Sequence, residues 1–305
     1  MKLENYNLLA IIGATATGKT SLAVELARQL DGEILSADSR QVYRGLDLGS
    51  GKDLDEYGNI PYHLIDIIDP ADEYDLFHYQ KDFHQAYDDI VSRDKTPIMC
   101  GGSSMYINAI LNNYEMKEVT VDEAQRLTWQ KKSLSELQQL LTTLKPEQHN
   151  QTDLIDRDRL IRALEIATQE QNHSTIDSSY TSINPLVIAL EWPREIRSKR
   201  IVERLKARFD DGMVEEVKSL HEQGVSWDKL YYFGLEYRLI ALFLQDELNY
   251  NDMFQKLASA IAKFAKKQDT WLRKMEREGL SIQRLEGGPD LFNRAMAIIQ
   301  CHQAS

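Results

Sequence analysis

A lysine, a threonine and two glycines near the start of the chain have the spacing of a polyphosphate-binding loop. In "LLAIIGATATGKTS" (residues 8–21), Gly13, Gly18, Lys19 and Thr20 fit the pattern G-x-x-x-x-G-K-[ST]. Such a loop directs several backbone N–H groups and a helix N-terminus at one point, which favours negative charge. Lys19 adds a cation for the terminal phosphates, and the Thr20 hydroxyl is a ligand suited to Mg²⁺. The proposed diphosphate-binding residues are Gly13, Ala14, Thr15, Ala16, Thr17, Gly18, Lys19 and Thr20.

The loop pattern does not say what happens to the bound polyphosphate. It can either donate a phosphoryl group or act as an intact leaving group. The second stretch with chemical potential, "SADSRQVYRGLDLGSGK" (residues 36–52), places Asp38 directly after an apolar run. A carboxylate at the end of such a strand suits a general base that takes a proton from an attacking group, as in nucleoside kinases. The alternative is that Asp38 only caps a turn.

A third stretch, "CGGSSMYINAI" (residues 100–110), joins a predicted strand to a predicted helix. Its two glycines permit close approach of the backbone, and Ser103 or Ser104 presents a hydroxyl at a helix N-terminus. Plain helix capping is the alternative for these serines. By itself this motif does not indicate catalysis.

Alternating strands and helices would have to position these residues. Apolar runs bounded by turn residues predict five strands, and helical patterns lie between them. The predicted strands are 8–13, 33–37, 62–67, 97–101 and 186–191, and the helices are 19–30, 76–92 and 105–112. This order predicts an α/β fold with a doubly wound parallel sheet. Ligands bind such sheets at the carboxyl ends of the strands, so Gly13, Asp38 and Gly101 are expected to line one crevice.

The strand rhythm stops after residue 113 and returns near Pro185. Segments such as "SLSELQQLLTTL" and "DRDRLIRALEIATQ" predict a helical insertion over residues 114–182, with a core domain formed by residues 1–113 and 183–305. Beyond Glu191 the sequence is mostly helical in pattern. The fold class is therefore a P-loop α/β core with a helical insertion and a helical C-terminal region.

Composition narrows the classes of partner and compartment. The net charge of −12 alone argues against nucleic acid, yet residues 194–208 and 263–277 are locally basic. Solvated amphipathic helices and a nucleic-acid surface both remain open for these segments. Two cysteines without metal-like spacing suit a reducing cytoplasm, and Cys100 reads as a buried strand residue. No signal peptide is expected, nor any apolar run of the ~20 residues that would span a membrane.

Six segments, taken in order, resemble the tRNA dimethylallyltransferase family. They are "GATATGKTSLAVELA", "SADSRQVYRGLDLGSGK", "PIMCGGSSMYINAIL", "DRLIRALEI", "RFDDGMVEEVKSL" and "AKKQDTWLRK", and the match runs from about Leu8 to Arg273. Adenylate isopentenyltransferases share the N-terminal segments but match the later ones less well. Six ordered segments are more specific than a phosphate loop alone.

The resemblance implies an answer to the question of the loop. Family members transfer the dimethylallyl group of dimethylallyl diphosphate to the exocyclic amine of the adenosine at tRNA position 37, so the loop would hold a leaving diphosphate with Mg²⁺ on Thr20. Asp38 would take the proton of the amine, and Ser103 stands where the family usually has threonine. A monomer is expected.

The resemblance also implies contacts with tRNA. Asp38, Ser39, Arg40 and Gln41 would meet the target nucleotide, which must leave its stack before it can react. In the insertion, Asp158, Arg159 and Arg162 would contact tRNA on one helix, with Arg126 as a looser candidate.

Three positions depart from the family pattern. Phe233 stands in place of an arginine, Glu236 in place of a glycine and Ala262 in place of another arginine. Lys52, Arg238 and Lys266 are candidate substitutes for the missing cations. A degenerate paralogue that binds tRNA or diphosphate with little activity is therefore one alternative. A P-loop kinase or adenylate isopentenyltransferase is the other, although no second Mg²⁺-binding aspartate or arginine-rich lid is evident.

Overall fold

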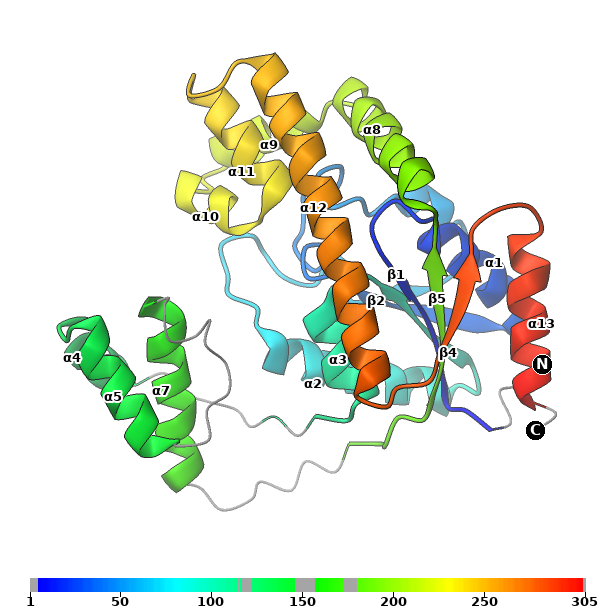
Figure 1. Ribbon diagram of the computed structural model, residues 1–305, viewed down its shortest axis with the longest axis horizontal. Coiled ribbons are helices and arrows are strands. Elements are labelled where there is room, and N and C mark those ends of the chain that lie inside the picture. Colours follow the sequence, from blue (N-terminus) through cyan, green and yellow to red (C-terminus); the bar gives the residue numbers. More distant parts are fainter. Residues whose placement is uncertain (1–4, 115, 117–121, 146–156, 173–179, 304–305) are drawn as a thin grey trace. The chain divides into compact units, whose positions relative to one another are not determined.

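The computed structural model describes residues 5–114, 116, 122–145, 157–172 and 180–303 (Figure 1). The chain divides into two compact units. The larger comprises Met1–Tyr114 with Thr181–Ser305, and the smaller comprises Glu115–Tyr180. None of the described helices is long and apolar enough to cross a membrane.

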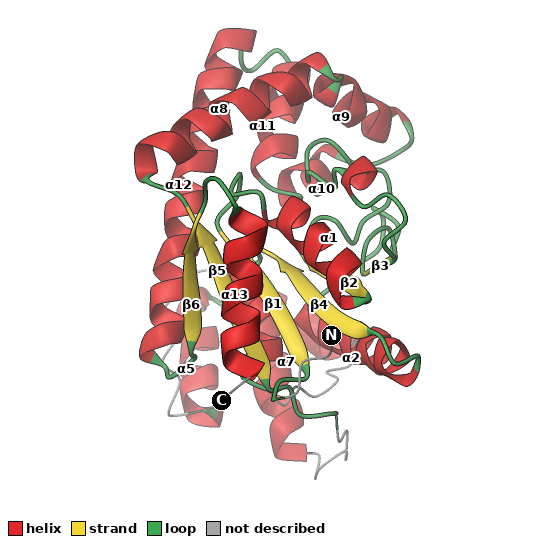
Figure 2. Cartoon of the chain, turned by 90° about the vertical axis from the view of Figure 1, so that its right-hand side faces the viewer, coloured by secondary structure: helices red, strands yellow, loops and turns green. Residues whose placement is uncertain are grey.

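The larger unit is built on a parallel six-stranded sheet in the order β3-β2-β4-β1-β5-β6 (Figure 2). The strands are β1 (Leu8–Gly13), β2 (Gly32–Ala37), β3 (Tyr62–His63), β4 (Thr96–Gly101), β5 (Pro185–Glu191) and β6 (Ile282–Glu286). The predicted α/β fold with a doubly wound sheet is confirmed. Because the chain order reverses on either side of β1, the carboxyl ends of β1 and β4 frame a crevice of the kind that binds ligands.

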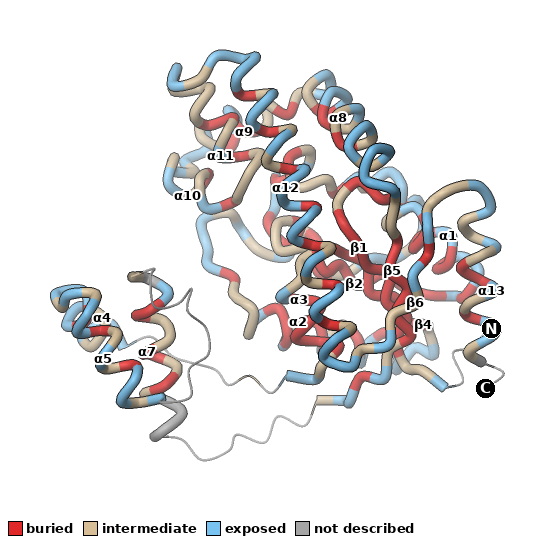
Figure 3. Tube along the Cα trace, viewed as in Figure 1, coloured by how far each residue is buried: buried red, intermediate tan, exposed pale blue. Residues whose placement is uncertain are grey.

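Helices cover both faces of this sheet, which explains why its central strands are continuously apolar. Along β1, Leu8, Ala10 and Ile12 enter one core, while Leu9 and Ile11 enter the other. The first core is shared with α2 (Leu76–Ser92), α3 (Ser104–Leu111) and α12 (Tyr250–Arg277), and the second with α1 (Lys19–Leu30) and α13 (Leu291–Gln303). Figure 3 shows the resulting band of buried residues along the strands.

The remaining helices of the larger unit follow β5. They are α8 (Arg194–Asp210), α9 (Met213–Glu222), α10 (Trp227–Tyr232) and α11 (Leu235–Leu244). A short 3-10 turn, Leu54–Glu56, lies earlier in the chain, between β2 and β3. Figure 1 shows α8 to α11 beyond the carboxyl ends of the strands, beside the start of α12. Residues of these helices can therefore line the side of the crevice that the sheet does not form.

Two predictions of strands were wrong. The third strand was expected over residues 62–67 but comprises only Tyr62–His63, because Leu64 and Asp66 take left-handed backbone angles of φ 65° and 55°. The region after Glu191 is mostly helical, as expected, but the five predicted strands omitted β6, which pairs in parallel with β5 at the sheet edge. The other predicted strands and helices are confirmed to within one residue at each end.

The smaller unit has its own apolar core, as an independently packed insertion requires. Its described helices are α4 (Glu123–Gln130), α5 (Leu134–Leu144) and α7 (Arg157–Asn172). Trp129, Leu137 and Leu164 are among the buried residues of this core. Ser133 begins α5 with a capping box that includes Glu136. These helices agree with the predicted helical insertion.

Candidate active site

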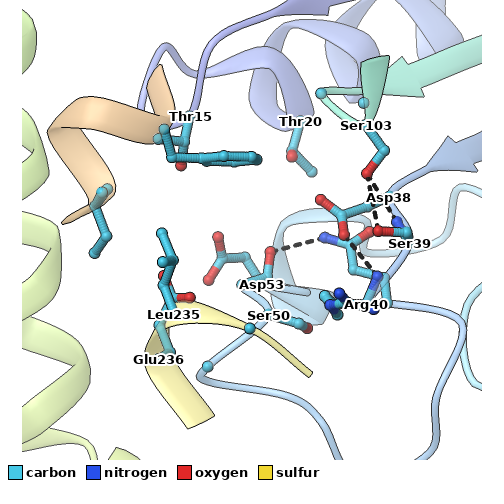
Figure 4. Close-up of a pocket in the computed structure, with 18 of the residues that line it drawn as sticks. Thr15, Thr20, Asp38, Ser39, Arg40, Ser50, Asp53, Ser103, Leu235 and Glu236 are labelled. Carbon is cyan, nitrogen blue, oxygen red and sulfur yellow. Dashed lines mark hydrogen bonds between the residues drawn. The ribbon is translucent and has the colours of Figure 1, made fainter. Parts of the chain in front are cut away.

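A pocket lies at the carboxyl ends of β1, β2 and β4 (Figure 4). Asp38 and Gly101 line it, as the strand pattern predicted. Gly13 was expected to line the same crevice but is not among the lining residues; it packs closely against the backbone of Leu190 in β5. The pocket is completed by residues of α8, α11 and α12, which follow in the second half of the chain.

The phosphate loop forms one wall of the pocket through Thr15, Lys19 and Thr20. Left-handed backbone angles at Ala16 (φ 63°) and Gly18 (φ 90°) shape the turn into α1. The Lys19 ammonium donates to the carbonyl of Ala14 at 2.8 Å. Burial lowers the pKa of Lys19 from 10.5 to about 8, and the neighbouring Arg204 contributes in the same direction. Ala14, Ala16 and Thr17 are buried and are not among the residues that line this pocket, so their predicted contact with diphosphate stays a prediction.

Two segments distant in sequence hold the loop in this shape. Gln268 of α12 accepts a hydrogen bond from Thr15 N–H at 2.9 Å and donates to the carbonyl of Gly102 at 2.7 Å. Trp192 donates from its indole nitrogen to the carbonyl of Thr17 at 3.0 Å. The buried Gln268 thus couples the phosphate loop to the turn that carries Ser103.

We predict that Gln268→Leu lowers the free energy of unfolding by about 1–3 kcal/mol, because it leaves the Thr15 N–H and the Gly102 carbonyl without their partner. Thermal denaturation measures this change as a lower Tm. Lys267→Leu, at the exposed neighbouring position of the same helix, is the matched control. An equal loss of Tm in both variants would contradict the role given to the amide.

Asp38, Ser39 and Ser103 converge on the wall opposite α11 (Figure 4). The Ser103 hydroxyl does not cap its helix; it accepts from Ser39 N–H at 2.9 Å, while Ser103 N–H donates to the carbonyl of Ala37 at 3.0 Å. Plain helix capping by Ser103 is therefore wrong. One carboxylate oxygen of Asp38 accepts from Arg40 N–H at 2.9 Å, so this residue both closes a turn and faces the pocket.

Gln41 ties the end of β2 to the loop that follows. Its carbonyl oxygen accepts from the Ser36 hydroxyl at 2.8 Å, and its amide nitrogen donates to the Gly51 carbonyl at 3.0 Å. The Glu216 carboxylate of α9 accepts from the backbone N–H groups of residues 47, 48 and 49 at 3.1, 2.6 and 3.1 Å. These bonds place Ser50 and Asp53 at the pocket.

Two arginines of α8 enter the pocket, and the sequence analysis did not select them. Arg204 donates to the Thr15 hydroxyl, and Arg208 lies 3.4 Å from an Asp53 carboxylate oxygen. Burial lowers the pKa of Arg204 to about 10, with a further contribution from the charge of Arg208. The interpretation of residues 194–208 as a fully solvated helix face is therefore wrong for the part that carries Arg204 and Arg208. The spacing of Arg200, Arg204 and Arg208 at i, i+4 and i+8 is the signal that could have revealed a single face.

The proposed substitutes for the missing cations do not reach the pocket. Lys52 is buried and binds the carboxylates of Asp47, at 2.6 Å, and Asp66, so its charge is already neutralised within the fold. Arg238 and Lys266 are exposed and are not among the lining residues. None of these three therefore replaces an arginine within the pocket, whereas a contact of the exposed Arg238 or Lys266 with tRNA stays a prediction.

The positions that depart from the family pattern have distinct surroundings. Phe233 is buried, with its ring centroid 4.9 Å from that of Tyr43 and 5.8 Å from that of Tyr237. Glu236 faces the pocket, and burial raises the pKa of its carboxyl. Ala262 is exposed on α12. An apolar cluster has thus taken the place of one expected cation, and a carboxyl group has been added nearby.

In the smaller unit, two of the predicted tRNA-contacting arginines share one buried carboxylate. Arg126 and Arg162 donate to Glu165 at 2.8 and 3.0 Å. Arg159 is exposed, whereas the side chain of Asp158 lies outside the described residues. A contact between any of these residues and tRNA remains a prediction.

The pocket offers oxygen ligands of the kind that Mg²⁺ prefers. They are the Thr20 hydroxyl and the carboxylates of Asp38 and Asp53. Among the described residues, no group of three or more His, Cys, Asp or Glu side chains is arranged to hold a metal. The donor set therefore fits an ion that takes part of its coordination from substrate phosphates.

The profile of the family described as "IPP transferase" matches residues 41–275, and that of "Isopentenyl transferase" matches residues 6–58. The sequence is 49% identical to tRNA dimethylallyltransferase 2 of Trichlorobacter lovleyi over 97% of each chain. It is 46% identical to tRNA dimethylallyltransferase 2 of Shewanella sediminis over 97% of this chain and 99% of the relative.

Solved structures share the fold. The full-length tRNA isopentenylpyrophosphate transferase of Bacillus halodurans superimposes with a TM-score of 0.71 at 26% identity, covering 98% of both chains. A eukaryotic dimethylallyltransferase acting on tRNA gives a TM-score of 0.78 at 21% identity over 96% of this chain and 78% of that one, a likeness of fold alone. With a profile that covers most of the chain and near-full-length relatives, this protein belongs to the IPP transferase family.

Proposed function

We propose that the protein transfers the dimethylallyl group of dimethylallyl diphosphate to the exocyclic amine of adenosine at tRNA position 37 and releases diphosphate. The observation that carries this proposal is the meeting of a phosphate loop and a carboxylate in one pocket, with Lys19 on one wall and Asp38 on the next. Relatives that match over nearly the whole chain bear the name tRNA dimethylallyltransferase, which supports this reaction over a kinase reaction.

The bonds that form and break in this reaction give each wall of the pocket a role. The lone pair of the amine forms a bond to the allylic methylene, while the bond between that carbon and the bridging oxygen breaks and its electron pair leaves with diphosphate. The Asp38 carboxylate receives the proton that the amine loses. Ser103, whose hydroxyl accepts from Ser39 N–H, would hydrogen-bond near the amine or the bridging oxygen.

The phosphate loop stabilises the charge that grows on the departing oxygen. The Lys19 ammonium and backbone N–H groups of the loop, other than that of Thr15, which binds Gln268, would be donors fixed before reaction, as electrostatic stabilisation requires. Thr20 would hold Mg²⁺ together with phosphate oxygens, and the ion would supply further positive charge to the leaving group.

Recognition of tRNA is proposed for both units. Ser39, Arg40 and Gln41 follow Asp38 at the pocket, where a flipped adenosine would enter. In the insertion, the exposed Arg159 is the leading contact, with Arg126, Asp158 and Arg162 on neighbouring positions. A monomer is proposed as the active unit. A cytoplasmic location is proposed from the two-cysteine content.

The reaction can be tested with radiolabelled dimethylallyl diphosphate, Mg²⁺ and an unmodified tRNA that carries adenosine at position 37. Label is expected in that tRNA and not in a matched tRNA with guanosine at the same position. Label on free adenylate would indicate an adenylate isopentenyltransferase, and ATP consumption a kinase. Absence of transfer under conditions that serve an active relative would indicate the degenerate paralogue.

A further inference from the structure

Arg208 projects from α8 into the pocket through a space that a glycine leaves. Gly51 has a left-handed φ of 70°, and a Cβ atom at this position would collide with the Arg208 guanidinium. The Arg208 side chain is 8% exposed, so the charged group is held within the protein rather than in solvent. The Arg208 side chain is therefore part of the pocket wall, and its position depends on the absence of a side chain at Gly51.

The Arg208 guanidinium has an N–H donor that none of the described residues accepts. Its described ion pair is a single long contact of 3.4 Å between Nη2 and Asp53. Its Nε–H is buried and has no hydrogen-bond partner among the described residues. A buried donor without a partner is costly, since it has lost water and gained nothing in exchange. Arg208 therefore has the capacity to bind a further acceptor in this pocket.

The charges around Arg208 indicate the kind of acceptor. Lys19, Arg204 and Arg208 all line the pocket, and the pKa of Arg204 is lowered partly by the charge of Arg208. Glu236, Asp38 and Asp53 also line it, yet none of them binds Arg208 at a short distance. Arg40 also lines the pocket, so four cationic side chains face three carboxyl groups there. This excess of positive charge favours a multiply charged anion.

We propose that Arg208 binds the diphosphate of the allylic substrate directly, and that it supplies the cation that the buried Phe233 cannot supply. Planar guanidinium donors match phosphate oxygens in a bidentate arrangement, which gives orientation as well as charge. Arg204 and Lys19 would approach the diphosphate from the side of the phosphate loop, while Arg208 would approach from the side of residues 49–53. The inference rests on the proposed function, because it takes the phosphate loop as the seat of the diphosphate.

A purely structural role for Arg208 makes a different prediction. If the side chain served only to anchor the segment around Asp53, removal of the Asp53 charge would have the same consequence as removal of the arginine. If Arg208 binds diphosphate, Asp53 is a competing anion, and Asp53→Asn leaves pyrophosphate affinity unchanged or raises it when Mg²⁺, for which Asp53 is also a candidate ligand, is left out. The pair of variants therefore separates anchoring from binding.

The test measures binding of inorganic pyrophosphate by isothermal titration calorimetry, with and without Mg²⁺, and the Asp53→Asn comparison is made without it. Arg208→Gln is expected to weaken the affinity by about 10- to 100-fold, as loss of a charge-assisted contact to phosphate would. Lys206→Gln removes the same charge from an exposed position of the same helix and is expected to change the affinity by less than about two-fold. Steady-state assays should show the loss in KM for dimethylallyl diphosphate, with KM for tRNA unchanged.

Each result tests either the binding of diphosphate by Arg208 or the proposed function. Binding by Arg208→Gln at the strength of the unsubstituted protein would overturn the role of Arg208 and leave the proposed function intact. A parallel loss of affinity in Asp53→Asn would overturn direct binding in favour of anchoring. Failure of the unsubstituted protein to bind pyrophosphate would refute the proposed function itself. Equal melting temperatures of Arg208→Gln and Lys206→Gln would exclude loss of folding as the cause.

Discussion

Asp38→Asn should reduce the turnover of dimethylallyl transfer by about 10²- to 10⁴-fold, the range expected when a general base is removed. An asparagine side chain retains an oxygen that can accept from Arg40 N–H, so the turn and the pocket should persist. What is lost is the capacity to take up the proton of the amine. Pyrophosphate affinity should therefore stay within about two-fold of the original, since the carboxylate does not hold the leaving group in this mechanism.

Single-turnover kinetics with labelled dimethylallyl diphosphate and calorimetry with pyrophosphate measure the two quantities separately. Asp55→Asn removes a carboxylate from an exposed position near the same loop and serves as the control. Turnover of Asp38→Asn equal to that of Asp55→Asn would refute the assignment of the base. A large loss of pyrophosphate affinity in Asp38→Asn would show instead that the carboxylate acts mainly through the metal or the diphosphate.

Lys19→Met should have a comparable effect on turnover, about 10²- to 10³-fold, but for a different reason. The lysine contacts the leaving group in both the bound state and the transition state, so pyrophosphate affinity should fall as well. This combination distinguishes the two residues, because loss of the base leaves binding intact. A variant that retained pyrophosphate affinity would contradict the placement of the diphosphate in the loop.

The lowered pKa of Lys19 adds a dependence on pH. Burial lowers this pKa from 10.5 to about 8, so the ammonium loses its charge as the pH rises through that value. Pyrophosphate affinity of the unsubstituted protein should consequently decrease between about pH 7 and pH 9. The difference between the unsubstituted protein and Lys19→Met isolates this effect from the titration of pyrophosphate and of other groups. A difference that stays constant across this interval would contradict it.

Much of the core could be predicted from the sequence because its signals are local. The phosphate-loop pattern lies within residues 13–20, and the apolar runs of β1, β2, β4 and β5 mark strands buried on both faces. A parallel sheet then brings its strand ends together, which predicts that Asp38 and Ser103 meet beside the loop. The strand β6 escaped notice because "IQRLE" is short and half polar, as suits an edge.

The rest of the site depends on contacts between distant segments. Lys52 and Arg208 are both cations, and nothing in their local sequence says that the first is neutralised by Asp47 and Asp66 while the second enters the pocket. Gln268 reaches the phosphate loop across 253 positions of sequence.

The sequence by itself therefore determined the family, the sheet and the two groups proposed to act on the reacting atoms. The tertiary structure alone decided which cations of α8 and which amide of α12 complete the pocket. The physical reason is that strands and loops reveal themselves through short-range periodicity and backbone preference. The partner of a buried charge is chosen by packing, which places it by distance in space and not by distance along the chain.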